Sequence, residues 1–139
     1  MRENKDKVVV VFDGDQRKLL TKHRKKFLNL IETNVDGAAD WFDQHVSFLP
    51  GDTWPERWLI LTASSDSPEI ASKFGANNRQ AKDALDFALQ QDKHSEIWGL
   101  AQKLAAGVDE TVDRLCLVCQ DLAEQEFTDV LKFLESKLK

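Results

Sequence analysis

The chain has 139 residues, of which 42% are hydrophobic and 31% charged, and its net charge is −5. This composition suffices for one domain with a packed core and excludes disorder as the default state. No apolar run approaches the roughly 18 residues that a membrane-spanning helix needs, and the acidic balance argues against a nucleic-acid partner, whose phosphates would need neutralising.

The N-terminal residues bear on the compartment. Residues 1–6 (MRENKD) are mostly charged, and the apolar stretch after them, Val8–Phe12, has only five residues. Such a stretch is too short for the core of a signal peptide. Two cysteines close together, Cys116 and Cys119, are typical of a reducing environment. We therefore expect a cytoplasmic protein.

The first predicted element is extended. Val8–Phe12 is apolar and rich in β-branched residues, which predicts a strand, although one strand cannot form a sheet. We assign residues 1–14 to an N-terminal extended segment. Asp15 then predicts the N-cap of a helix that continues to about Glu32.

Short amphipathic helices follow along the rest of the chain. The pattern is clearest where Ala81, Ala84, Leu85 and Ala88 recur at helical spacing. Three segments are expected over Ala38–Val46, Ser67 to Gly75 and Ser95 to Gly107. Another helix is expected to be capped by Asp52 or Thr53 with Pro55 in its first turn, and a further one to begin at Asn77 or Asn78. Asp109 is expected to begin the last stretch.

The last predicted stretch contains a polar interruption. The letters AEQE (123–126) either bend one helix or separate two, so we assign residues 120–139 to a C-terminal helical extension. The sum is six or seven short helices with short connections, which predicts an all-α bundle.

Asp13 and Asp15 raise the question of an enzyme. An apolar strand followed by Asp-Gly-Asp is how dehalogenase-type phosphatases present a nucleophile and a general acid. Arg17 stands where such enzymes carry a small residue, and the alternating strands of their sheet are missing. We therefore expect no catalytic activity, no cofactor and no small-molecule substrate, with Asp15 serving as a helix cap.

Two further motifs have structural and functional interpretations. Residues 69–85 (EIASKFGANNRQAKDAL) resemble a helix-turn-helix, but the second helix offers only Arg79 and Lys82 as cations, offset by Asp83 and Asp86. The CLVC pair, Cys116–Cys119, has metal or redox spacing but no second pair to complete a zinc site. A small nucleic-acid-binding regulator therefore stays as an alternative, and the cysteines are expected in the core.

Charge is strongly segregated along the first half of the chain. From Gln16 to Phe27 there are six Lys or Arg and no acid, whereas from Glu32 to Glu56 there are six acids and no Lys or Arg. Charged faces are usually only solvated. Complementary fields can also orient association.

Several segments, in this order, resemble the caspase-recruitment domain (CARD) of the death-fold superfamily. They are LLTKHRKKFLNLI (19–31), VDGAADWF (35–42), RQAKDALDFAL (79–89), IWGLAQKL (97–104) and VDETVDRL (108–115). The resemblance covers about residues 16–119. It implies an antiparallel six-helix bundle of Greek-key type over residues 15–119, acting as a homotypic interaction module in cell-death or innate-immune signalling.

Such domains bind one another through a basic and an acidic helical surface, so the resemblance also implies the interface residues. The basic residues would be Arg17, Lys18, Lys22, Arg24, Lys25, Arg79 and Lys82. The acidic residues would be Asp36, Asp40, Asp43, Asp52 and Glu56. The partner would be another domain of this type or a second copy of the chain. A third alternative is a helical structural subunit that docks through the apolar stripe of Phe127–Leu138.

Overall fold

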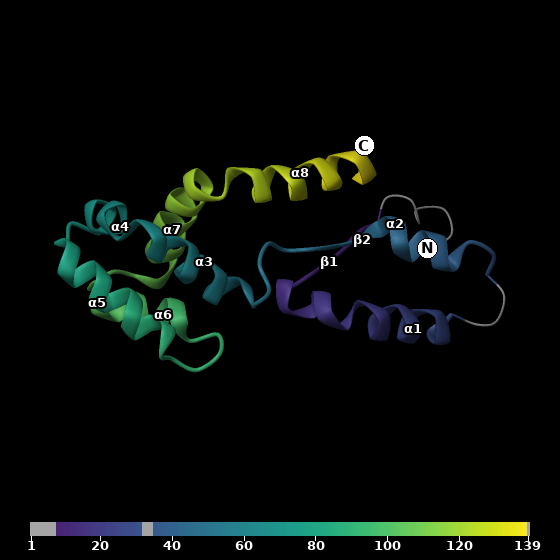
Figure 1. The fold of residues 1–139 in the computed structure, drawn as a ribbon, viewed down its shortest axis with the longest axis horizontal. Helices are drawn as coiled ribbons and strands as arrows, with labels where there is room; N and C mark the ends of the chain where they lie inside the picture. Colours follow the sequence, from purple (N-terminus) through teal and green to yellow (C-terminus); the bar gives the residue numbers. More distant parts are fainter. Residues whose placement is uncertain (1–7, 32–34, 139) are drawn as a thin grey trace. The chain divides into compact units, whose positions relative to one another are not determined.

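The computed structural model describes residues 8–31 and 35–138, and this part of the chain is mostly helical with one small sheet (Figure 1). The all-α expectation therefore holds in its coarse form. The strands are β1 (Val10–Phe12) and β2 (Val46–Phe48), and the 3-10 helices are η2 (Gly14–Leu19) and η3 (Ser64–Asp66). The α-helices are α1 (Leu20–Leu30), α2 (Ala38–His45), α3 (Pro55–Ala63), α4 (Ser67–Phe74), α5 (Asn78–Leu89), α6 (Glu96–Lys103), α7 (Val108–Leu122) and α8 (Glu124–Leu138).

The chain divides into two compact units. Unit 1 is Met1–Thr53 with Thr128–Lys139, and unit 2 is Trp54–Phe127. The divisions therefore fall after residues 53 and 127, whereas the sequence analysis places them after residues 14 and 119. The helices α1 and α2 belong to unit 1, and α3 to α7 make up the bundle of unit 2.

Unit 1 contains a parallel two-stranded sheet. Val10 pairs with Val46, Val11 with Ser47 and Phe12 with Phe48, and Leu49 N donates to the Phe12 carbonyl at 2.8 Å. The valine run thus has a partner strand that the sequence analysis missed, since it placed Val46 at the end of a helix. Three residues carry too weak a pattern to predict β2, which is stabilised only because β1 lies beside it.

The start of the first helix differs from the expected one. Asp13, not Asp15, occupies the position before η2, and its backbone carbonyl accepts a hydrogen bond from Gln16 N at 3.0 Å. Asp15 lies in the first helical turn. The chain passes from strand to helix within one residue, which leaves no room for a separate capping residue after Gly14.

Aromatic rings pack between the elements of unit 1. The Phe12 ring stacks on His23 of α1 and on Phe48 of β2, with ring centroids 4.7 and 5.8 Å apart. The Phe27 ring stacks on Trp41 and tilts against the buried Phe42, which packs α1 on α2. Offset and tilted ring pairs stabilise by about 0.5 to 1.5 kcal/mol beyond the area they bury.

Unit 2 has the larger hydrophobic core. Its fully buried large side chains come from five different helices. They are Ile60, Ile70, Leu85, Leu100 and Leu115. Burying each such side chain stabilises by about 1.5 to 3 kcal/mol. Alanines fill further core positions, as predicted for α5, where Ala81, Ala84 and Ala88 are all buried, and small side chains let helix axes approach closely.

Helix ends in unit 2 follow local chemistry. Gly75 ends α4 in the left-handed conformation at φ 63°, as predicted, and of the two predicted caps of α5 it is Asn77 that caps the helix, in a capping box with Gln80. Other starts are shifted from the expected residues. Trp54 precedes α3, Asp66 caps α4 by accepting from Glu69 N, and Gly107 precedes α7.

The polar interruption near the C-terminus separates two helices. Ala123 lies between α7 and α8 in a non-helical conformation, and it is buried. The Phe127 ring meets Trp58 edge to face within unit 2, with centroids 5.5 Å apart. Across the residues described, no helix combines the length and apolarity needed to cross a bilayer.

Candidate protein-interaction surface

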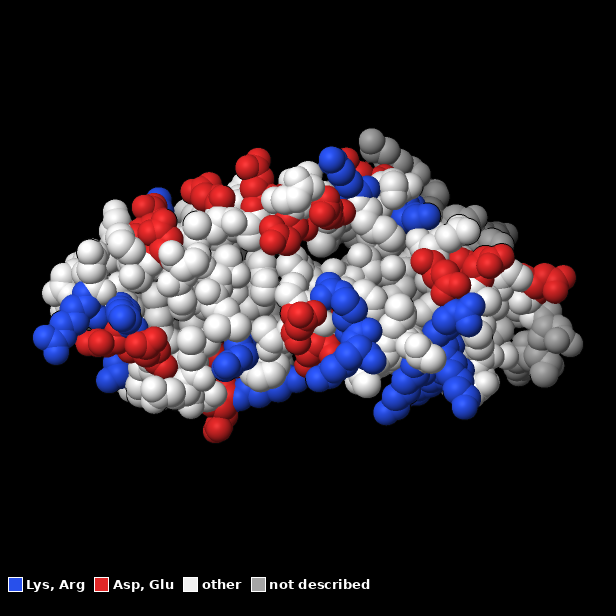
Figure 2. All heavy atoms as spheres, in the orientation of Figure 1, with Lys and Arg blue, Asp and Glu red and all other residues white. Residues whose placement is uncertain are grey.

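The predicted interface residues lie on both units. Arg17 and Lys18 are in η2, Lys22, Arg24 and Lys25 are on α1, and Asp40 and Asp43 are on α2. Asp36 and Asp52 lie in the flanking loops of unit 1, whereas Glu56, Arg79 and Lys82 lie on helices of unit 2. Figure 2 shows basic side chains gathered over α1 and acidic side chains over α2.

Arg24 and Asp43 pair with each other inside unit 1. Arg24 Nε donates to one Asp43 oxygen at 2.8 Å and Nη2 donates to the other at 3.2 Å, a two-bond geometry that fixes both side chains. The hydrogen bond from Arg24 lowers the pKa of Asp43, and the same bond raises the pKa of Arg24. The pair therefore joins α1 to α2, and its charges are not free for a partner.

The pKa shift of Asp43 predicts a pH dependence. Because its folded-state pKa is lowered, its contribution to stability is present above its ordinary pKa of about 4 and is lost as the pH falls through the folded value. Asp43→Asn should therefore destabilise unit 1 modestly at neutral pH and have no effect near pH 2. Hydrogen exchange of α1 and α2 amides at both pH values measures this. An equal effect at both pH values would contradict it, and Asp36→Asn is the matched control.

Arg17 is also occupied within unit 1. Its Nη1 donates to the Gly51 carbonyl at 2.5 Å and to Asp52 Oδ1 at 3.1 Å, and its Nη2 donates to the Leu49 carbonyl at 3.1 Å. Its guanidinium also lies over the Phe48 ring, 5.5 Å from the centroid. Arg17 therefore holds the loop after β2 against η2.

The Asp-Gly-Asp turn has a structural part in the same region. The backbone of Gly14 lies against residues 50 and 51 so closely that a side chain there would meet both carbonyl oxygens. Gln16 Nε2 donates to Asp15 Oδ1 at 3.2 Å, and the oxygen of the same amide lies 2.9 Å from His23 Nε2. The turn thus joins β1, η2 and α1 through local hydrogen bonds.

Four lysines remain exposed after this internal pairing. Lys18, Lys22, Lys25 and Lys26, which we call the lysine face, make no ion pair within residues 8–31 and 35–138. Spacings of three and four residues place Lys22, Lys25 and Lys26 on one side of α1, and Lys18 lies before them in η2. On the acidic side Asp36 and Asp40 stay exposed without an ion pair in the described structure, although the Asp40 charge acts on Arg24.

The helix-turn-helix segment offers a nearly neutral surface. Arg79 lies 3.9 Å from Asp83 with 91% of its side chain exposed, and Lys82 stands beside the exposed Asp86 on the same helix. Phosphate recognition depends on an excess of cations. In this segment α4 and α5 are joined by a short turn, and the two cations of α5 are offset by two acids on the same helix.

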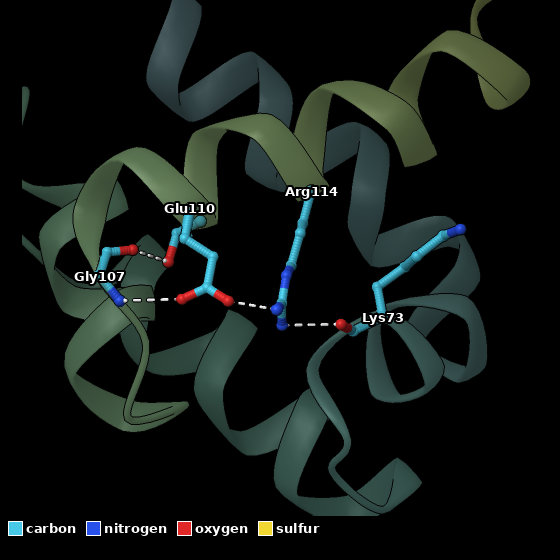
Figure 3. A network of polar contacts seen from close by, with 5 residues as sticks. Lys73, Gly107, Glu110 and Arg114 are labelled. Carbon is cyan, nitrogen blue, oxygen red and sulfur yellow. Dashed lines mark hydrogen bonds and ion pairs between the residues drawn. The ribbon is translucent and has the colours of Figure 1, made fainter.

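Arg114 forms a network that the sequence analysis did not predict. It donates to the Lys73 carbonyl at the end of α4 at 2.8 Å and pairs with Glu110, whose other oxygen accepts from Gly107 N at 3.4 Å (Figure 3). Its guanidinium lies 5.2 Å from the Phe74 ring centroid. Only the i, i+4 spacing of Glu110 and Arg114 signals this network, which satisfies a terminal carbonyl of α4.

Trp54 lies in a cluster of charged side chains at the start of unit 2. Its indole Nε1 donates to Glu96 Oε1 at 2.5 Å, and Glu96 is fully buried with its Oε2 atom lacking a hydrogen-bond partner in the described structure. Lys93 Nζ stands 4.8 Å from the Trp54 ring centroid. Glu56 pairs with His94, whose Nδ1 lies 3.1 Å from Glu56 Oε1. Glu56, a predicted interface residue, thus has a partner within unit 2.

The two cysteines are reduced and lack the character of redox thiols. Cys119 is buried, as expected, and donates to the Leu59 carbonyl at 3.4 Å, whereas Cys116 is exposed, so the core expectation is wrong for Cys116. Burial raises the pKa of Cys119 to about 12, and burial together with Asp113 raises the pKa of Cys116. A reactive thiol needs the opposite shift. Within the described ranges no group of three or more His, Cys, Asp or Glu is placed to hold a metal ion.

Comparison of the chain with known protein families, curated proteins and solved structures finds no match. The assignment of function therefore depends on the surface chemistry described above.

Proposed function

We propose that this chain is a non-enzymatic interaction module that assembles with itself, or with a related CARD-type domain, through oppositely charged helical surfaces. In this proposal it recruits or oligomerises a signalling partner in a cell-death or innate-immune type of response. The observation that supports this proposal most is the lysine face. Its four exposed lysines lie within just over two helical turns and have no acidic neighbours on their own side of the helix.

The internal ion pairs reduce the interface that the sequence implies. Arg17, Arg24, Asp43 and Asp52 stabilise unit 1, so the proposed contacts use Lys18, Lys22, Lys25 and the remaining aspartates. A six-helix death fold would require helices corresponding to α1 and α2 in one bundle with the others. Because α1 and α2 lie in unit 1 and α3 to α7 lie in unit 2, the proposal rests on charge layout and not on topology.

Salt and charge reversal test the proposal. Exposed ion pairs each contribute up to about 1 kcal/mol and are screened by salt, so several pairs acting together should give association at about 50 mM salt that weakens tenfold or more at about 500 mM. Lys22→Glu with Lys25→Glu should abolish the association and leave helix content unchanged. Sedimentation velocity and circular dichroism measure the two quantities.

A matched control variant distinguishes the effect of the lysine face from the effect of net charge. Lys132→Glu with Lys137→Glu changes the net charge equally but lies on α8, so it should leave association intact. Equal effects of both double variants would show that only total charge matters. A wild-type chain that stays monomeric at every salt concentration would contradict self-assembly.

A further inference from the structure

The solvent face of α7 carries an acidic row. Asp109, Asp113, Leu117 and Asp121 follow one another at intervals of four residues, and all are exposed, with Leu117 at 53%. The single cation of α7 is Arg114, which is turned toward Lys73 of α4 (Figure 3). The acidic row therefore has no compensating charge on its own helix.

A basic row runs along η2 and α1. Lys22, Lys26 and Leu30 follow one another every four residues on α1, with Lys18 before them in η2, and Leu30 is 75% exposed. Residues four apart form the ridges by which helices pack, with axes about 8 to 10 Å apart. Each row thus combines three charges of one sign with an exposed leucine.

The acidic residues of α2 fit the basic row less well than the acidic row of α7 does. Asp43 is bound by Arg24, and the charge of Asp40 already acts on the same arginine. Unit 2 carries seven Lys or Arg against thirteen acids, whereas unit 1 carries twelve against eleven. The excess negative charge therefore belongs to the unit that contains α7.

We propose that the basic row of one copy binds the acidic row of α7 on a second copy of this chain. The proposal rests on the self-assembly proposed above, and it assigns the acidic surface to α7 in place of the aspartates of unit 1. Charge complementarity orients the helices, and the exposed leucines supply an apolar patch among the charges. Because the two surfaces are different patches on one molecule, a bound pair still offers one free basic row and one free acidic row, and the contact propagates.

A mixing experiment tests the pairing. Variant A carries Lys22→Glu and Lys26→Glu, and variant B carries Asp113→Lys and Asp121→Lys. Each alone should be monomeric at about 50 mM salt, because like charges then face each other. Mixed, the intact basic row of variant B can bind the intact acidic row of variant A, and the two reversed rows are also complementary, so sedimentation should show that association is restored. A chain with all four substitutions should regain self-association.

The outcomes distinguish the failure of this pairing from the failure of self-assembly. If wild type and variant B associate equally while variant A does not, the lysines bind elsewhere and the α7 pairing is overturned. If variants A and B remain monomeric when mixed, although both are folded by circular dichroism, the pairing is also overturned. A monomeric wild type overturns both proposals. Asp86→Lys with Asp92→Lys matches the charge change of variant B away from α7 and should leave association unchanged.

Discussion

Gly14→Ala should unfold unit 1 more readily than any surface substitution. A Cβ atom at residue 14 would lie 2.9 Å from the Pro50 carbonyl oxygen and closer still to the Gly51 carbonyl oxygen. These are backbone atoms that Arg17 holds in place, so they cannot move aside as a flexible side chain would. We expect a loss of about 3 kcal/mol, at the upper end of overpacking costs.

Hydrogen exchange measures this loss unit by unit. Amides of α1 and β2 should lose protection in Gly14→Ala, while amides of α5 and α7 keep theirs. Gly107→Ala is the control, because its added Cβ would meet only Glu110 Cβ at 4.0 Å. Unchanged protection of α1 in Gly14→Ala would show that the loop of residues 49–52 is not held against η2.

Trp54→Phe should be the most damaging conservative substitution in unit 2. The indole N–H is the hydrogen-bond donor to the fully buried Glu96, and phenylalanine fills similar space without a donor. Removing its donor leaves a buried polar group without a hydrogen-bond partner, so we expect a loss of about 1 to 3 kcal/mol. Urea unfolding followed by circular dichroism gives the value, since it does not depend on tryptophan emission.

Glu96→Gln provides the matched test of the same contact. Glutamine keeps the size and can still accept from Trp54, so its own effect should stay within about 1 kcal/mol. In the Glu96→Gln background, Trp54→Phe should cost less than in the wild type if the carboxyl group strengthens the contact. Equal costs in both backgrounds would mean that Trp54 acts only through packing and a hydrogen bond that glutamine accepts equally well.

Local sequence was sufficient for most helices. The spacing of Ala81, Ala84 and Ala88 predicted the buried face of α5, and Gly75 and Asn77 marked the turn before it. These signals act over one or two turns, through hydrogen bonds between neighbouring residues. The polar AEQE interruption also marked a boundary, although only the structure shows that it separates α7 from α8.

Charge segregation was visible in the sequence, but its meaning was not. Arg17 is 35 residues from Asp52, and Arg24 is 19 residues from Asp43. No local pattern indicates which cation meets which acid over such separations. In the structure these four residues form two ion pairs within unit 1, and Lys18, Lys22, Lys25 and Lys26 stay exposed.

By itself, the sequence determined a mostly helical chain with an acidic balance, a basic first helix and the turns that separate most helices. Only the tertiary structure decided that Val46–Phe48 is a strand, that α1 and α2 belong to a different unit from α3 to α7, and that Glu96 is buried under Trp54. Helix periodicity is encoded within a few residues. Strand pairing, unit boundaries and buried polar contacts depend on residues far apart in the chain, which meet only when it folds.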